Sequence, residues 1–187
     1  VRVEPDCSQA GYFWAAAAIT GSTVEVGGTR LESRQGDIRL VEILARMGCT
    51  VARHASGVAV TGGELSAADI DMGDIPDVVP TLAVVAAFAR GRTIIRNVAH
   101  LKEKESDRLA AVCSELSKMG IQSGYDDKGL WVQGGQPHGA AIDCHNDHRI
   151  AMSFALAGLK TPGVRILDET CVQKSFPAFW DVFEGLY

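Results

Sequence analysis

The chain has 187 residues, of which 47% are apolar and 22% are charged, and its formal net charge is −5. A chain of this length and composition can bury one globular core, and the acidic balance argues against a nucleic acid or an anionic membrane as a partner. Any anion that it binds must therefore meet a local cluster of cations.

The first predicted unit begins with a short strand in "VRVEP". Asp6 then opens a helix, "CSQAGYFWAAAAIT", which Gly21 closes, and the strand "STVEV" follows. After a polar loop a second helix, "GDIRLVEILARMG", ends at Gly48, because glycine commonly stops a helix just past its last turn. The hairpin "CTVARHASGVAV", turning at Ser56 and Gly57, and the strand "AADIDMG" complete a β-α-β-α-β-β unit.

This unit recurs twice along the chain. Asp77 and Asp147 open the corresponding helices, 71 and 70 residues after the preceding aspartate, and Gly91 and Gly163 fall where Gly21 does. The second copy has its hairpin near residues 127–129, and the third stops after "AFWDVFEGLY". We therefore predict a single domain, residues 1–187, made of pseudo-repeats 1–70, 71–142 and 143–187, the last incomplete.

The predicted fold class is α/β (α+β). Strands that alternate with helices ordinarily indicate a parallel sheet, but the hairpins require antiparallel neighbours. The helices "YFWAAAAI" and "LAVVAAFA" are apolar on all sides, which is typical of helices buried within a domain. We expect sheets on the outside and helices packed within.

The strand-to-helix junctions that carry the three aspartates are candidate sites. Asp is a preferred helix N-cap, and this is a sufficient explanation for Asp6. Asp147 is different, because His148 and Arg149 follow it directly, and three such side chains are a costly choice for capping alone.

The junction before the second helix of the second unit reads "KEKESDR". It places Lys104, Glu105 and Arg108 at the first turn of a helix, where free N–H groups and the helix dipole favour an anion. Cations at this end are unfavourable unless an anion meets them. We interpret the run as half of an anion receptor with a carboxylate inside it; the alternative is a solvated run of charge.

The motifs "IPD", "KESDRL", "NDHRIAM" and "KSFPAFW" have an order and spacing that closely resemble the C-terminal half of the 5-enolpyruvylshikimate-3-phosphate (EPSP) synthase family. The resemblance runs from Val1 to Tyr187. It implies the enolpyruvate transferase fold, an inside-out α/β barrel-like domain with buried helices and outer sheets. It also implies that a matching N-terminal domain is missing. UDP-N-acetylglucosamine enolpyruvyl transferase and a non-catalytic anion-binding domain are the alternatives.

The implied reaction moves the enolpyruvyl group of phosphoenolpyruvate to the 5-hydroxyl of shikimate 3-phosphate, with release of phosphate, in aromatic amino acid biosynthesis. Such a site needs cations for a carboxylate and a phosphate, and carboxylates that can move protons. The resemblance implies no metal and no cofactor. This chain would carry the phosphoenolpyruvate side and be inactive alone, and the full-length enzyme is expected to be a monomer.

The resemblance also implies a role for each matching residue. Asp77 is the expected base near the target hydroxyl, Glu105 the acid–base group at C3, and Lys104 a substrate contact that assists proton transfer. Which carboxylate is the acid and which the base stays open, because two interacting carboxylates can titrate as a pair. The expected substrate-binding residues are Arg108 and Arg149 on the phosphoenolpyruvate carboxylate, Lys174 and His100 on phosphates, and Asp147 and His148, with Asp147 as an orienter or cap.

Other polar residues have weaker signals. His54, His138 and His145 have no motif around them and are expected to be ordinary surface or satisfied residues. Arg34, Gln35 and Asp37 occupy the loop of the first unit that corresponds to "KEKESDR", and we interpret them as structural or as lining the cleft.

The cysteines point to a reducing compartment. Cys7, Cys49, Cys113, Cys144 and Cys171 are an odd number, widely spaced and without a CxxC pair, which suits neither a disulfide framework nor a zinc site. No apolar run is long enough for a transmembrane helix, and the start does not resemble a signal peptide. We expect a cytoplasmic protein, and the first residue, which is not methionine, suggests a fragment.

Overall fold

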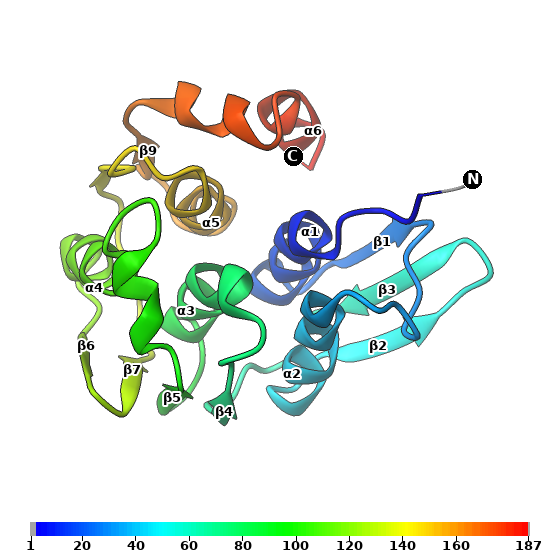
Figure 1. Ribbon diagram of the computed structural model, residues 1–187, viewed down its shortest axis with the longest axis horizontal. Helices are drawn as coiled ribbons and strands as arrows, with labels where there is room; N and C mark the ends of the chain where they lie inside the picture. Colours follow the sequence, from blue (N-terminus) through cyan, green and yellow to red (C-terminus); the bar gives the residue numbers. More distant parts are fainter. Residues whose placement is uncertain (1–2, 187) are drawn as a thin grey trace.

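The structure is a computed structural model that describes residues 3–186 (Figure 1). Its helices are α1 (Cys7–Thr20), α2 (Leu40–Arg46), α3 (Val79–Ala87), α4 (Arg108–Lys118), α5 (His148–Gly158) and α6 (Phe179–Glu184). Short 3₁₀ turns precede four of them: η1 (Gly36–Arg39), η2 (Pro76–Val78), η3 (Ala99–Glu103) and η4 (Glu169–Lys174). Among the described residues, none of the helices is long and apolar enough to cross a membrane.

The strands form three small sheets. The strands are β1 (Thr23–Gly27), β2 (Thr50–Arg53), β3 (Gly57–Thr61), β4 (Asp69–Asp71), β5 (Arg92–Arg96), β6 (Ser123–Asp126), β7 (Gly129–Gln133), β8 (Ala141–Ile142) and β9 (Arg165–Ile166). Their orders are β1-β3-β2, β4-β5-β7-β6 and β8-β9. The pairs β4–β5 and β8–β9 are parallel. The two predicted hairpins, β2–β3 and β6–β7, are confirmed as antiparallel pairs.

Three apolar helices form the centre of the molecule. Helices α1, α3 and α5 pack against one another, and in Figure 1 they lie together in the middle, with β1-β3-β2 on one side and the strands β4 to β7 below. Every residue of α3 is buried, and the run Ala15–Ala18 of α1 is buried too. The predicted arrangement of buried helices and outer sheets is therefore confirmed, and it follows from helices that are apolar around their whole circumference.

The three aspartates at the starts of these helices have different structural roles. Asp6 caps α1 by accepting hydrogen bonds from the backbone N–H groups of Ser8 and Gln9 at 2.8 and 3.2 Å, and Asp147 caps α5 through the N–H of Arg149 at 2.9 Å. Asp77 lies inside η2 and caps nothing. Proline at position 76 begins this 3₁₀ turn, so the chain turns before α3 and leaves the carboxylate of Asp77 free for other partners.

Two further expectations about the ends of elements were wrong. Gly21, with φ 77°, caps α1, but Gly91 and Gly163 lie beyond the ends of α3 and α5, in the left-handed turns before the next strands. The predicted first strand is absent from the described residues, because residues 3–5 have no regular structure. Val1 and Arg2 lie outside the described residues.

Candidate active site

Charged side chains from four separate segments meet at the starts of α3, α4 and α5. The sequence-predicted residues that join this network are Asp77 from η2, Lys104 and Glu105 from the segment after η3, Arg108 from the start of α4, Asp147, His148 and Arg149 from the start of α5, and Lys174 from the end of η4. Because α3 and α5 pack side by side in the core, their first residues are held close together.

Asp77 is the carboxylate with the most cations around it. Its Oδ1 lies 3.2 Å from Nη1 of Arg108 and 4.0 Å from Nζ of Lys104, and its Oδ2 accepts a hydrogen bond from Nη2 of Arg149 at 3.0 Å. The side chain is 36% exposed. The carboxylate can therefore be reached from solvent while positive charge surrounds it.

Arg108 and Asp147 form a buried ion pair beneath Asp77. Nε of Arg108 donates to Oδ2 of Asp147 at 2.7 Å and Nη2 donates to Oδ1 at 3.3 Å. The two side chains are 3% and 0% exposed, and Ser106 adds a hydroxyl hydrogen bond to Asp147 at 3.1 Å. Burial favours the neutral carboxyl, but the Arg108 hydrogen bond and charge outweigh it and lower the pKa of Asp147.

This pairing corrects the expectation drawn from the "KEKESDR" run. Helix α4 begins at Arg108, and Asp107 caps it by accepting from the N–H of Ala110 at 3.0 Å. Lys104 and Glu105 therefore precede the helix instead of lying in its first turn. Two cations of the run, Lys104 and Arg108, are met by carboxylates of the same chain, which explains why so much charge can gather there.

Glu105 is shared between two donors. Its Oε2 lies 2.9 Å from Nδ1 of His148, and its Oε1 accepts a hydrogen bond from Nζ of Lys174 at 2.5 Å. Burial acts to raise the pKa of Glu105, but the Lys174 hydrogen bond and the nearby His148 outweigh it, and the pKa is lowered. A carboxylate between a lysine and a histidine is placed to exchange protons with a ligand.

His148 is held on the buried side of Glu105. The residue is only 6% exposed, and this burial is the main reason why its pKa is lowered, although Glu105 acts in the opposite direction. Arg149 lowers it further. The ring is therefore neutral at neutral pH and can offer Glu105 one N–H.

The low pKa of His148 should make folding stability fall on mild acidification. An unfolded chain binds this proton near the ordinary pKa of 6.5, whereas folded His148 binds it only at lower pH, so protonation favours the unfolded state below that value. We expect the free energy of unfolding to fall between about pH 7.5 and pH 5.5, and His148→Gln to flatten the fall. Urea unfolding at the two pH values measures the change in the free energy of unfolding. The control is His54→Gln, because the His54 side chain is half-exposed. Equal slopes for the parent and His148→Gln would contradict the prediction.

Two residues that the sequence did not single out as catalytic lie beside this network. Oδ1 of Asp37 is buried without a hydrogen-bond partner in the described structure, and burial, followed by the nearby charge of Asp77, raises the pKa of Asp37. The hydroxyl of Tyr12 is buried close to Arg149, and burial raises its pKa to about 12 although Arg149 acts to lower it. The apolar pattern of α1 hides Tyr12, and only the "QGD" loop of the first unit hints at Asp37.

Not every predicted residue joins the network. His100 lies exposed on η3, and the structure gives it no contact with the charged cluster. His54 instead lies 2.7 Å from Glu25, and His145 lies 2.9 Å from the buried Glu115, so both are satisfied residues as expected.

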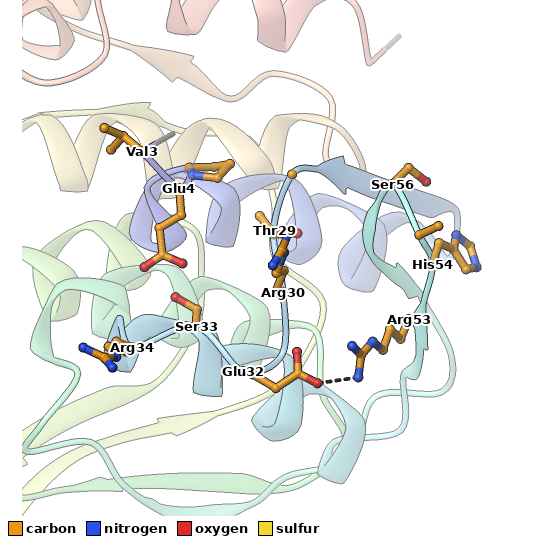
Figure 2. Close-up of a pocket in the computed structure, with 13 residues that line it drawn as sticks. Val3, Glu4, Thr29, Arg30, Glu32, Ser33, Arg34, Arg53, His54 and Ser56 are labelled. Carbon is orange, nitrogen blue, oxygen red and sulfur yellow. Dashed lines mark hydrogen bonds and ion pairs between the residues drawn. The ribbon is translucent and has the colours of Figure 1, made fainter. Parts of the chain in front are cut away.

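One cavity lies away from the charged cluster. It has a volume of about 860 Å³ and lies between the first residues of the chain, the loop after β1 and the β2–β3 turn, as Figure 2 shows. Its charged side chains include Arg53 and Glu32, which pair with each other. A second cavity, of about 510 Å³, is the one at the cluster, and it is lined by Glu105, Asn146, Thr170, Cys171 and Lys174.

Part of the cluster has the donor atoms that a metal ion would need. Donor atoms of Glu105, Asp147 and His148 all lie within 4.8 Å of one another. Arg108 already neutralises Asp147, and Lys174 already neutralises Glu105. The chemistry that the arrangement favours is therefore proton transfer beside a bound anion, since cations and carboxylates alternate through the ion pairs of the cluster.

Comparison with known proteins agrees with this geometry. The family model described as EPSP synthase (3-phosphoshikimate 1-carboxyvinyltransferase) matches residues 1–183. The 3-phosphoshikimate 1-carboxyvinyltransferase of Syntrophobacter fumaroxidans is 53% identical over 187 residues, covering 98% of this chain and 44% of that protein. The protein of the same name from Salmonella schwarzengrund is 44% identical over 189 residues, covering 98% and 43%. The chain thus spans less than half the length of these curated relatives.

Solved structures show the same fold. The EPSP synthase of Acinetobacter baumannii matches with a TM-score of 0.87 and 31% identity, over 99% of this chain and 46% of that chain. The enolpyruvyl transferase NikO of Streptomyces tendae matches with a TM-score of 0.75 and 21% identity, over 100% and 44%. The predicted α/β enolpyruvate transferase fold is confirmed.

Proposed function

Since the chain belongs to the EPSP synthase family, we propose that it forms the phosphoenolpyruvate-binding half of a 3-phosphoshikimate 1-carboxyvinyltransferase. One observation carries the proposal: Glu105, a carboxylate shared by a lysine and a histidine, lies beside the ion pairs of Asp77, which is held by three cations. Donor atoms of Glu105 and His148 lie within 4.8 Å of Asp147, and Asp147 shares Arg108 with Asp77. The pseudo-repeats 1–70, 71–142 and 143–187 would build the C-terminal domain, and a separate N-terminal domain would supply most of the site for shikimate 3-phosphate.

The reaction can be written so that each proton has a place. Asp77 takes the proton of the 5-hydroxyl as its oxygen bonds to C2 of phosphoenolpyruvate, while Glu105 delivers a proton to C3. Glu105 then removes a proton from C3 as the C2–O bond to the phosphate breaks, which restores the double bond, and the proton taken up by Asp77 leaves with the phosphate. Positioned carboxylates of this kind contribute about 10²–10⁴ in rate each.

The cations would bind the acidic substrate. We assign the carboxylate of phosphoenolpyruvate to Arg108 and Arg149, and its phosphate to Lys174. Both arginines now hold Asp77, so an arriving carboxylate would compete for them and leave Asp77 freer to act as a base. Lys104, Asp147, His148 and His100 complete the proposed set, with His100 directed at the phosphate of shikimate 3-phosphate.

The length of a relative supports a second domain that would face the proposed site. The proposed site opens at one end of the buried helices, on a chain that matches only 44% of its S. fumaroxidans relative, and the rest of that protein has the length to form a facing domain. Closure of two such domains would exclude water from the reacting groups. We further propose a cytoplasmic enzyme that is a monomer at full length.

A hybrid enzyme tests the function directly. In this hybrid, the segment of the S. fumaroxidans protein that aligns with this chain is replaced by the chain. We expect the hybrid to release phosphate from phosphoenolpyruvate only when shikimate 3-phosphate is present, and the 187-residue chain alone to show no turnover, because it lacks the facing domain.

Three outcomes would contradict the proposal. Turnover by the chain alone would show that no second domain is needed, and turnover with UDP-N-acetylglucosamine would support the amino-sugar transferase instead. Anion binding that Arg149→Ala abolishes, in a hybrid without turnover, would support a domain that only binds. The unmodified S. fumaroxidans enzyme is the matched control for each assay.

A further inference from the structure

A buried carboxylate outside the charged cluster holds the turn that leads into α5. Glu115 of α4 has a side chain that is 0% exposed. Its Oε1 lies 2.9 Å from Nε2 of His145, and its Oε2 accepts a hydrogen bond from the backbone N–H of Asp143 at 3.0 Å. Lys118 donates to both oxygens at 2.9 and 2.7 Å. The carboxylate therefore links α4 to two residues of one turn.

That turn has an unusual backbone. His145 and Asn146 both have left-handed conformations, with φ values of 51° and 52°. A residue other than glycine costs of order 1–3 kcal/mol in such a conformation and keeps it only where its surroundings enforce it. Glu115 supplies that enforcement from one side, and Oδ1 of Asp143 supplies it from the other by accepting the N–H of His145 at 2.8 Å.

The turn sets the positions of groups in the proposed active site. Asp147 and His148 follow Asn146 directly; Asp147 binds Arg108, and His148 contacts Glu105. Asn146 itself lines the cavity beside Glu105 and Lys174. A rotation of the left-handed pair would therefore move the groups that orient the arginine and the acid–base carboxylate.

We propose that Glu115 and His145 are positioning residues, which hold the turn at 143–146 so that Asp147 and His148 meet Arg108 and Glu105 correctly. The inference rests on the proposed function for its catalytic consequence. It assigns Glu115 and His145 no contact with the substrate. Their effect passes through the backbone of the turn.

The test uses two partners of the same carboxylate. His145→Gly removes the ring but suits the left-handed backbone, so it releases the turn without adding strain. Lys118→Ala removes a partner that hydrogen-bonds to Glu115 and not to the turn, and it is the matched control. His145→Gln, which restores an N–H donor on a side chain of similar length, tests for rescue.

In the hybrid enzyme, we expect His145→Gly to lower kcat about tenfold, because small misplacements of catalytic groups are costly. The KM for phosphoenolpyruvate should change less, since Arg108 and Lys174, two of the three proposed binding cations, lie on segments other than this turn. Lys118→Ala should leave kcat within about twofold of the parent, and His145→Gln should recover part of the loss. A residue that only stabilises the fold would change the unfolding transition and leave kcat alone.

Nuclear magnetic resonance of the 187-residue chain gives a readout that does not depend on turnover. The ring signals of His148 should shift in His145→Gly and stay in place in Lys118→Ala. Unchanged His148 signals, or an active hybrid in which His145→Gly keeps the parental kcat, would overturn the inference. An inactive hybrid would instead count against the proposed function, and the His148 signals would still decide the role of Glu115 and His145.

Discussion

Glu105→Gln in the hybrid enzyme should lower kcat by about 10²–10⁴, the range expected when a positioned acid–base group is lost. The amide has nearly the same shape and can still meet His148 and Lys174, but it cannot carry a proton to or from C3. The KM for phosphoenolpyruvate should change far less, because the proposed binding cations stay in place. Steady-state phosphate release measures both constants.

A matched control lies two residues earlier. Glu103→Gln removes the same charge from the same run, but Glu103 is exposed on η3 and makes no ion pair with the cluster. It should keep kcat within about twofold of the parent, as surface charge changes usually do. Equal activity of the two variants would exclude Glu105 as the proton carrier.

The low pKa of Glu105 adds a requirement to this prediction. In the free site, burial is outweighed by the Lys174 hydrogen bond and by His148, so Glu105 is ionised at neutral pH and has no proton to give. A substrate phosphate that binds Lys174 would withdraw that hydrogen bond and let the pKa of Glu105 rise. The proposed proton donor would therefore become an acid only once phosphoenolpyruvate is bound.

The sequence was a good guide to the architecture because its signals are local. Helices that are apolar all round, such as α3, must be buried, and hairpins must pair antiparallel. The repeat of aspartates at Asp6, Asp77 and Asp147 placed equivalent junctions near one another. These signals sufficed to bring the residues of the motifs to one end of the buried helices.

The pairing of side chains could not be read in the same way. The position of Asp77 in the repeat is that of a helix N-cap, but Pro76 begins a 3₁₀ turn there. The carboxylate of Asp77 instead pairs with Arg108 and Arg149, which are distant in the sequence. Glu115 and Lys118 are three residues apart on α4, which is the spacing of many surface ion pairs, yet Glu115 is fully buried and binds a turn some thirty residues later. Such contacts depend on how α4 packs against β8, and no short segment encodes that.

Arg108→Met should destabilise the 187-residue chain by about 3–5 kcal/mol, the cost of removing one partner from a buried ion pair. Asp147 would keep a charge at 0% exposure with no cation beside it, and methionine fills the space of the arginine stem but not its charge. Urea unfolding followed by circular dichroism measures the loss. Arg96→Met is the control, because its pair with Asp69 at 3.1 Å is on the surface, with 53% of the arginine side chain exposed, and such pairs contribute about 0–1 kcal/mol.

The double variant Arg108→Met with Asp147→Asn separates charge from packing. Both variants lose the three hydrogen bonds of Arg108, but removing both charges eliminates the uncompensated carboxylate, so the double variant should be more stable than Arg108→Met alone. It also keeps the prediction testable if Arg108→Met fails to fold. The pH dependence of this stability follows from the lowered pKa of Asp147. The ionised Asp147 stabilises the folded state fully above its ordinary pKa of 3.8, and this stabilisation disappears as the pH falls through the lower pKa of the folded state. A cost for Arg108→Met no greater than that for Arg96→Met would mean that the buried pair contributes little to the fold and that Arg108 is kept for binding alone.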